Sequence, residues 1–282
     1  IYTVWDLQHR KQSFFPEVSV AGWKFKDREK RYNFVIPRAA YVVSGNDAGK
    51  EEVIKFYGIP SKRVKTIPMP TRDFVFNAFD IDCNFEKNLP ENFLFYPAQF
   101  WPHKNHIVIL YALKILKEKY SLDFSVVFTG SDKGNLSYIK QKVKELGLQE
   151  KVHFFGFVSI KELVTLYRKA FALVFPSFFG PDNIPPLEAF ALKCSVIAAR
   201  VDGSQYQLKD AALLFEPTSE NELADCIKKL FDDKELRSKL INNGVFKAKA
   251  FSSQNYIKEI CKIFDEFTLI RRCWSNTEKY KE

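Results

Sequence analysis

Several residue patterns that define specialised protein classes are missing from this sequence of 282 residues. Its five cysteines are scattered, odd in number and without C-x-x-C spacing, so neither a disulfide framework nor a zinc knuckle is expected, and a reducing compartment is indicated. No apolar run approaches the roughly 18 residues that a membrane-spanning helix needs. Internal repeats and low-complexity tracts are also absent, and a hydrophobic fraction of 46% excludes general disorder.

The chain begins with Ile1 rather than Met, and no secretory signal peptide follows. We therefore expect a trimmed piece of a longer chain, in the cytoplasm or at the inner face of the membrane. The formal net charge is +9, and residues 1–70 hold 13 Lys and Arg against 7 Asp and Glu. Such a surface favours phosphates, anionic lipid or nucleic acid, although a solvated basic face is the commoner explanation. The candidate contact with an anionic membrane is the cluster Lys24, Lys26, Arg28, Lys30 and Arg31.

Hydrophobic periodicity alternates between strand-like and helix-like segments. The expected strands are 40–43, 64–67, 93–96, 124–129, 152–155, 172–175, 195–199 and 212–215. The expected helices are 47–57, 103–119, 135–146, 160–169, 186–193, 220–231, 234–250 and 254–270. This alternation predicts an α/β protein whose parallel sheet is covered by helices on both faces. Ligands of such sheets bind at the carboxyl ends of the strands. The loops at that edge are 99–104, 130–134, 156–158 and 177–186.

The chain also divides into regions. Residues 68–90 carry three prolines and no clear period, so they are the predicted linker. Residues 1–67 supply too few strands for a complete domain and are expected to form a partial N-terminal domain. Residues 91–250 are the predicted C-terminal domain, and the helices within 251–282 are expected to return towards the N-terminal domain.

Two local patterns resemble well-known sites without fitting them. Residues 45–50 look like a phosphate-binding P-loop, but the glycine spacing is one residue short and Glu51 stands where Ser or Thr would hold magnesium. Asp47 is instead the expected N-cap of a helix. His103 and His106 lie three apart on an expected helix with no third ligand nearby, so a surface or capping role is expected rather than a metal site.

Two further segments run from a strand end into a helix start. In residues 96–105, backbone amides and the helix dipole favour an anion, and Lys104 adds a positive charge there, although a lone lysine is more commonly just solvated. In residues 175–191, a proline suits the first helical turn, and Glu188 is expected in that turn, where the dipole favours a carboxylate. Glu188 could simply complement the helix end, or it could accept two hydrogen bonds from a vicinal diol such as a ribose.

Together these loops resemble the nucleotide-sugar-binding half of the retaining family-4 (group 1) glycosyltransferases, which have the GT-B fold. Further similar segments are 156–158, 166–170, 175–177 and 210–217, with 6–9 and 42–44 upstream. The family usually shows Gly-Arg before its lysine; here Gln99 replaces the arginine and Lys104 keeps the lysine. The family also has two glutamates eight positions apart; Glu188 matches the second, and Gly180 stands at the first.

The resemblance implies two Rossmann-like domains, the N-terminal one truncated, and no metal or other cofactor. It implies transfer of a hexose, with retention of the anomeric configuration, from a nucleotide sugar such as GDP-mannose or a UDP-sugar to a glycan or lipid-linked acceptor. The implied setting is polysaccharide or lipopolysaccharide biosynthesis, and no nucleic-acid partner is implied. The implied catalytic residues are Lys104, Glu188 and Asp182, the last replacing the lost glutamate. The implied donor-binding residues are Gln99, Lys104, Gly130, Ser131, Phe157, Val158, Asn183, Ile184, Pro185 and Glu188. The implied acceptor-side residues are Asp6, His9 and Arg10.

Two other interpretations stay open on the sequence. One is a sugar-nucleotide epimerase or related enzyme of the same fold. The other is a fragment that binds a nucleotide sugar without catalysis, because Gly180 replaces the first glutamate and part of the N-terminal domain is expected to be missing.

Overall fold

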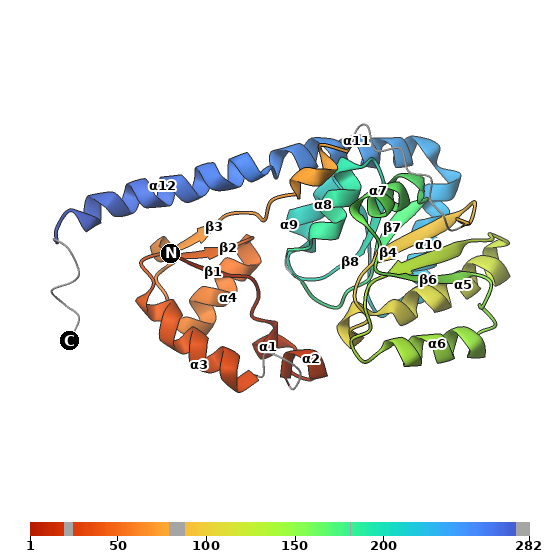
Figure 1. Ribbon diagram of the computed structural model, residues 1–282, viewed down its shortest axis with the longest axis horizontal. Helices are drawn as coiled ribbons and strands as arrows, with labels where there is room; N and C mark the ends of the chain where they lie inside the picture. The colour runs from red at the N-terminus through yellow and green to blue at the C-terminus, as the bar shows by residue number, and fades with distance from the viewer. Residues whose placement is uncertain (20–24, 79–87, 181, 275–282) are drawn as a thin grey trace.

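The computed structural model describes residues 1–19, 25–78, 88–180 and 182–274, which form two α/β units side by side (Figure 1). The smaller unit is built on a three-stranded sheet and the larger on a six-stranded sheet, and every strand pair is parallel. The predicted α/β class with parallel sheets is therefore confirmed. Within the described residues, none of the helices combines the length and the apolar character that crossing a bilayer requires.

In the smaller unit the strands follow each other in chain order, with β2 in the middle. They are β1 (Tyr2–Val4), β2 (Val42–Ser44) and β3 (Val64–Thr66). The helices are α1 (Gln8–Lys11), α2 (Pro16–Ser19), α3 (Phe25–Val35) and α4 (Asp47–Tyr57). The N-cap of α4 is Asn46, whose side chain accepts a hydrogen bond from the Gly49 amide at 2.9 Å. The prediction of Asp47 was wrong by one residue; Asp47 instead accepts from the Thr66 hydroxyl at 2.8 Å.

The larger sheet has the strand order β6-β5-β4-β7-β8-β9. Its strands are β4 (Phe93–Pro97), β5 (Ser125–Thr129), β6 (Val152–Gly156), β7 (Ala172–Phe175), β8 (Ser195–Ala199) and β9 (Leu213–Phe215). The chain builds outward from β4 on one side and then outward from β7 on the other. This is the doubly wound order, and its switch point lies between β4 and β7.

Helices cover both faces of this sheet. They are α5 (His106–Tyr120), α6 (Leu136–Glu145), α7 (Ile160–Lys169), α8 (Ile184–Ala191), α9 (Ser204–Leu208), α10 (Glu220–Asp232) and α11 (Lys234–Ala250). On one face α5 packs against α6 and α10, and on the other α8 packs against α11 (Figure 1). The strands are buried on both faces, which explains why they read as continuous apolar runs in the sequence.

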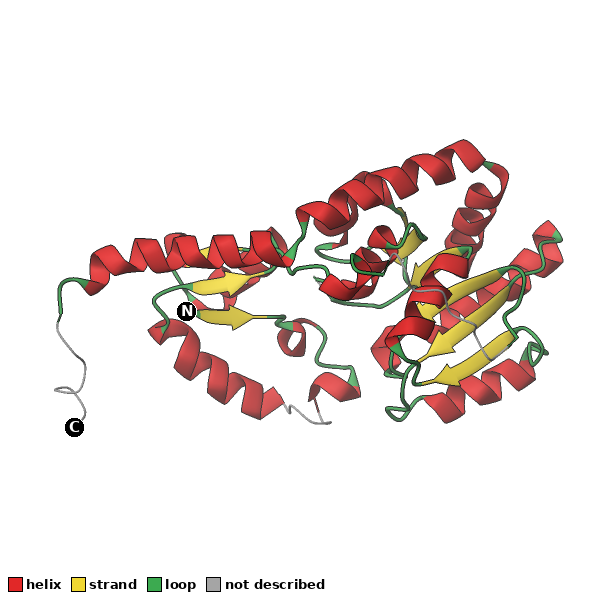
Figure 2. Ribbon diagram, turned by 45° about the horizontal axis from the view of Figure 1, so that its top comes forward, coloured by secondary structure: helices red, strands yellow, loops and turns green. Residues whose placement is uncertain are grey.

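Two segments tie the units together. Residues 71–78, inside the predicted linker 68–90, pack on the larger unit, where Val75 and Ala78 join its core; residues 79–87 lie outside the described part. The last helix, α12 (Ser253–Arg271), follows α11 and lies along the smaller sheet (Figure 2). Its Ile263 packs with Val43 and Ile67.

The helical segments α1, α2, α3 and α9 were not predicted from the sequence. Helix α8 begins at Ile184, two residues before the predicted start at Pro186. That difference moves Glu188 from the first turn of α8 into the second.

Candidate functional site

The two segments singled out in the sequence flank the switch point of the larger sheet. β4 and β7 are neighbours, but the chain leaves β4 towards β5 and leaves β7 towards β8. Diverging connections of this kind open a crevice at the carboxyl edge of a parallel sheet, which is where such folds bind ligands. The loop after β4 carries Gln99 and Lys104, and the loop after β7 leads to Glu188.

Lys104 ends a 3₁₀ turn, Pro102–Lys104, which connects β4 to α5. The Tyr96 hydroxyl donates a hydrogen bond to the Lys104 carbonyl at 2.8 Å. Asn105, with a φ of 54°, fixes the turn by donating from its side-chain amide to two carbonyls of neighbouring loops. Among the residues that the structure describes, no carboxylate lies within ion-pair distance of the Lys104 ammonium, and burial lowers the pKa of Lys104 to about 8. A cation without a carboxylate partner at this edge is suited to bind an anion.

Glu188 is buried, with 2% of its surface exposed. Its Oε2 accepts a hydrogen bond from the Tyr167 hydroxyl at 2.8 Å, and its Oε1 lies 3.1 Å from Nε of Arg72. Burial raises the pKa of Glu188, while Arg72 and Tyr167 act in the opposite direction. Since Glu188 lies in the second turn of α8, the expected dipole contact with the first turn was wrong. Oε1 accepts no hydrogen bond from any described residue, so this buried oxygen can still accept one from a ligand hydroxyl.

A cavity of about 260 Å³ opens beside these loops. Its lining includes four residues expected to bind the donor, Gln99, Gly130, Phe157 and Val158. Arg72, the charged residue among those that were not expected, also lines it. A side chain cannot replace Gly130, because φ is 135° there and a Cβ atom would lie 2.4 Å from the Ala98 carbonyl oxygen. The Phe157 side chain is 83% exposed, so an aromatic face is available at the cavity.

Other expected donor-binding residues make internal hydrogen bonds. The Ser131 carbonyl accepts from a backbone amide of the loop after β4 at 3.0 Å. The backbone amide of Asn183 donates to Oε1 of Gln207 at 3.1 Å, so Gln207 occupies a donor that we had expected to face phosphate. Ile184 and Pro185 form the first residues of α8.

Gly180 and Asp182 lie apart from that cavity. At Gly180 φ is 129°, and a Cβ atom would lie 2.4 Å from Oδ1 of Asn183, so the local backbone is incompatible with a glutamate. Asp182 accepts a hydrogen bond from Nδ2 of Asn46 in the smaller unit at 3.2 Å. Burial raises the pKa of Asp182 to about 6. Asp182 lines a separate cavity of about 240 Å³ together with Gly45, so the structure does not bring it to the cavity that Gln99 lines.

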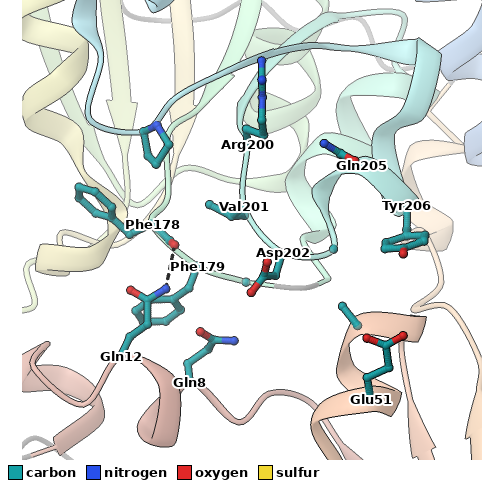
Figure 3. A pocket seen from close by; sticks show the side chains of 14 residues that line it. Gln8, Gln12, Glu51, Phe178, Phe179, Arg200, Val201, Asp202, Gln205 and Tyr206 are labelled. Carbon is teal, nitrogen blue, oxygen red and sulfur yellow. Dashed lines mark hydrogen bonds between the residues drawn. The ribbon is translucent and has the colours of Figure 1, made fainter.

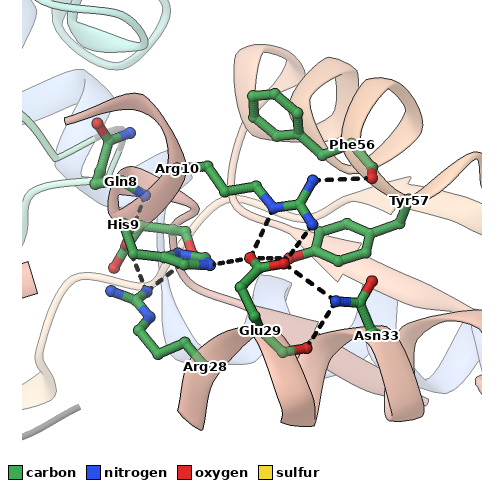
Figure 4. Close-up of polar contacts among 9 residues, drawn as sticks. Gln8, His9, Arg10, Arg28, Glu29, Asn33, Phe56 and Tyr57 are labelled. Atoms are coloured by element: carbon green, nitrogen blue, oxygen red, sulfur yellow. Dashed lines mark hydrogen bonds and ion pairs between the residues drawn. The ribbon is translucent and has the colours of Figure 1, made fainter. Parts of the chain in front are cut away.

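The expected acceptor-side residues form a polar network inside the smaller unit (Figure 4). Nε2 of His9 lies 2.7 Å from Oε1 of Glu29, and Nε of Arg10 donates to the same oxygen at 2.7 Å. Asp6 accepts from Arg28 at 2.7 Å. Hydrogen bonding by Arg10 lowers the pKa of Glu29 to about 2. Because His9 is fully buried, this network fastens α1 to α3 in the present arrangement.

A larger cavity of about 570 Å³ lies between the two units (Figure 3). Polar and aromatic residues line it, among them Gln8, Gln12, Glu51, Arg200, Asp202 and Tyr206. Contacts across it include the ion pair of Lys11 with Asp202 and the hydrogen bond from Gln12 to the Phe178 carbonyl at 3.2 Å. Sequence reasoning missed these residues, although Gln8 lies inside the similar segment 6–9.

A surface or capping role was expected for His103 and His106, but both are buried, so the surface placement was wrong. His103 donates its backbone amide to Oε1 of Glu17 at 2.8 Å, its Nδ1 contacts the same oxygen, and its ring stacks on Phe179 with centroids 4.0 Å apart. His106 stacks on Phe100, and burial lowers the pKa of His106 to about 3. Within the described ranges, no group of three or more His, Cys, Asp or Glu residues has the arrangement of a metal site.

The basic cluster is smaller at the surface than the sequence indicated. Lys26, Lys30 and Arg31 are exposed on α3. Arg28 is buried and paired with Asp6, so including it in a surface face was wrong. Lys24 lies outside the described residues.

Comparison with known proteins assigns this architecture to one family. A model of the family described as "Glycosyl transferases group 1" matches residues 80–245, more than half of the chain. The O-antigen chain mannosyltransferase RfbU of Salmonella typhimurium is 29% identical over 195 residues, which cover 69% of this chain and 52% of that protein. The O-antigen chain mannosyltransferase B of Escherichia coli is 23% identical, covering 82% and 62%. The chain therefore spans about half to two thirds of the length of these relatives.

Solved structures share the fold. A sucrose-phosphate synthase from Thermosynechococcus elongatus superposes with a TM-score of 0.77 at 21% identity, covering 95% of this chain and 67% of that one. Anabaena Alr3699/HepE in complex with UDP-glucose gives a TM-score of 0.75 at 16% identity, covering 94% and 71%. The expectation of a GT-B fold is thereby confirmed.

Proposed function

The chain belongs to the glycosyl transferases of group 1, and from this premise we propose that it moves a hexosyl group from a nucleotide sugar to a hydroxyl of a glycan or lipid-linked acceptor, with retention. O-antigen mannosyltransferases among its relatives support GDP-mannose as the donor and polysaccharide biosynthesis as the setting. A fold neighbour in complex with UDP-glucose supports a UDP-sugar as the other candidate.

One observation carries this proposal: a cation without a carboxylate partner, a buried carboxylate and a glycine-lined cavity lie at the carboxyl edge of the same sheet. Lys104 and Glu188 come from the loops that flank the switch point. The cavity at the same edge is lined by Gly130 and by Arg72, the ion-pair partner of Glu188. A nucleoside diphosphate presents an anion, a vicinal diol and a flat base. In our proposal Lys104 binds the diphosphate, Glu188 binds the ribose hydroxyls, and the base lies in the cavity near Phe157.

In the proposed reaction the bond from the anomeric carbon to the diphosphate oxygen breaks, and its electron pair leaves with the diphosphate. The acceptor hydroxyl oxygen forms the new bond on the same face of the sugar, and its proton passes to the leaving phosphate. The transition state resembles an oxocarbenium ion. The protein therefore has to stabilise negative charge that develops on the diphosphate, which is the role we assign to Lys104.

The test is to incubate the protein with GDP-mannose and with UDP-hexoses, with and without glycan acceptors, and to measure nucleoside diphosphate release and the anomeric configuration of the product by NMR. We expect acceptor-dependent release and a product with the anomeric configuration of the donor. Glu188→Ala should abolish it, whereas Lys239→Ala, which removes an exposed lysine of α11, should leave it unchanged. Release with an inverted product would refute retention.

A second candidate function, nucleotide-sugar binding without catalysis, is favoured by the backbone at Gly180. A glutamate cannot occupy that position without rearrangement, and Asp182 contacts Asn46 rather than lining the cavity beside Gln99. Tight binding of a nucleotide sugar, with no release of nucleoside diphosphate in the presence of any acceptor, would establish this alternative.

We also propose a cytoplasmic location with contact to an anionic membrane surface. The four cysteines in the described residues are all free, in agreement with a reducing compartment. Lys26, Lys30 and Arg31 are exposed on α3, and Phe34 of the same helix is 62% exposed. Exposed cations beside an exposed aromatic side chain are the features by which a helix binds the surface of an anionic bilayer.

A further inference from the structure

Arg72 comes from the segment that joins the two sheets, yet its backbone is fixed on the larger unit. The neighbouring Thr71 is fully buried; its amide donates to the Phe251 carbonyl at 2.7 Å and its hydroxyl to the Ala248 carbonyl at 3.3 Å. On the other side, Val75 is buried in the core of the larger unit. Arg72 is thus held in place beside the carboxyl edge of the sheet.

The guanidinium of Arg72 is only partly used by the protein. Its Nε lies 3.1 Å from Oε1 of Glu188, and its Cζ lies 6.0 Å from the centroid of the Phe74 ring. No described residue accepts a hydrogen bond from its two terminal nitrogens. The two terminal nitrogens of an arginine carry four N–H donors in a planar fork, and in Arg72 all four remain for a ligand. The side chain is 55% exposed, which leaves room for one.

Among the described residues that line this cavity, Arg72 is the only charged one. Arg72, Gln99 and Gly130 line the same cavity, and Gln99 contributes no charge. A buried Glu188 beside an anionic ligand would repel it, because charges in a partly dry site are weakly screened. An arginine that pairs with Glu188 through Nε offsets this repulsion and still presents donors to phosphate oxygens.

We propose that Arg72 is a donor-binding residue: it holds Glu188 through Nε and binds the diphosphate of a nucleoside diphosphate through its terminal N–H groups. This inference rests on the proposed function and adds a contact that lies outside the strand–helix loops. A purely competitive role predicts the opposite result. If Arg72 only paired with the Glu188 carboxylate until the ribose hydroxyls displaced it, removing Arg72 would strengthen nucleotide binding.

The experiment is calorimetric titration of the whole chain with UDP, GDP, uridine and guanosine at constant pH and ionic strength. Arg72→Ala should weaken binding of the nucleoside diphosphate that the parent binds by about tenfold or more, with a much smaller effect on the bare nucleoside. Arg72→Lys should recover only part of the loss, because a single ammonium cannot reproduce the planar fork. Lys239→Ala removes one positive charge from an exposed position on α11 and should leave both affinities unchanged.

Thermal melting of each variant shows whether it is folded, and Arg72→Met preserves much of the side-chain packing if Arg72→Ala does not fold. Unchanged or tighter diphosphate binding by the Arg72 variants would overturn this inference while leaving the proposed function intact. Equal losses for nucleoside and nucleoside diphosphate would overturn the phosphate contact. If the parent binds neither UDP nor GDP, the proposed function fails, and this inference fails with it.

Discussion

Replacing Lys104 tests whether the carboxyl edge of the larger sheet binds a diphosphate. The lysine ends the turn after β4, has no carboxylate within ion-pair distance in the described part of the chain, and has its pKa lowered to about 8 by burial. Lys104→Ala removes the charge, and Lys104→Arg keeps a charge that does not titrate below pH 12. The turn itself is held by Tyr96 and Asn105 through backbone and side-chain contacts that neither substitution removes.

A charge-assisted hydrogen bond contributes about 1.5–3 kcal/mol, and each 1.4 kcal/mol corresponds to a factor of about ten in affinity. Lys104→Ala should therefore weaken nucleoside diphosphate binding by roughly 10- to 150-fold at pH 7. The sign of the pH dependence follows from the pKa of about 8. Below that value Lys104 is charged and binds the anion, and above it the charge is lost while the diphosphate stays ionised. Affinity in the parent should fall by about tenfold between pH 7 and pH 9.

The assay is calorimetric titration of nucleoside and nucleoside diphosphate at pH 6.5, 7.5, 8.5 and 9.5. Lys104→Ala should lose the pH dependence along with the affinity, and Lys104→Arg should bind without the fall above pH 8. The arginine variant is also the control for Lys247, whose pKa burial likewise lowers to about 8, because any pH dependence that Lys104→Arg retains must come from another group. Equal losses for the bare nucleoside and the diphosphate, or the same pH dependence in all three proteins, would refute the assignment.

Three further predictions concern the neighbouring features. Gly180→Ala should destabilise the protein by about 1–3 kcal/mol, because φ is 129° there and the new Cβ would lie 2.4 Å from the Asn183 side chain; an unchanged melting temperature would contradict this backbone conformation. The pKa of Asp182 is raised to about 6, so the parent protein loses stability as pH rises through that value and the buried carboxyl ionises. Asp182→Asn cannot ionise and should therefore stabilise the protein by about 1–3 kcal/mol at pH 7.5 and not at pH 3.5. A stabilisation that persists at pH 3.5 would show another cause. Co-sedimentation with anionic vesicles should fall steeply with salt and weaken in a Lys26→Gln, Lys30→Gln double variant, since the Debye length is about 8 Å at physiological salt; absence of binding at low salt would end the membrane proposal.

The larger sheet could be predicted from the sequence because its signals are local. Its strands are buried on both faces and therefore form short apolar runs. Helices such as α7 and α10 have one apolar and one polar face, so their apolar residues recur with the helical period over many residues. The loops at the carboxyl edge followed from the strand–helix alternation alone. Lys104 was found because it lies in the loop between a buried strand and the next helix, and Glu188 because the prolines after β7 mark the start of a helix close to it.

The smaller unit was harder to predict for physical reasons. Helix α3 is strongly polar along its length and buries only Arg28 and Tyr32, so periodicity gives little signal. The helices α1 and α2 have four residues each, too few to establish a helical period. The start of α8 was misplaced because Pro185 and Pro186 both suit a first turn, so the sequence allows either boundary.

Contacts between distant residues could not be predicted at all. Arg72 and Glu188 are 116 positions apart, and Glu17 and His103 are 86 apart. Nothing in the local sequence of one member indicates the other, since their meeting depends on how distant segments pack in the folded chain. The role of Gln207 in occupying the Asn183 amide is likewise a property of the folded chain.

The most direct test of the account is whether Glu188 recognises a ribose. Calorimetric titration should compare ribo- and 2′-deoxyribonucleoside diphosphates on the parent, Glu188→Gln and Glu188→Ala, with thermal melting of each protein. We expect the parent to prefer the ribo form, Glu188→Gln to retain part of this preference, and Glu188→Ala to lose it, because an unpaired buried hydroxyl costs about 1–3 kcal/mol. A Glu188→Ala protein that still prefers the ribo form as strongly as the parent would contradict the account and leave Glu188 as a structural partner of Tyr167 and Arg72.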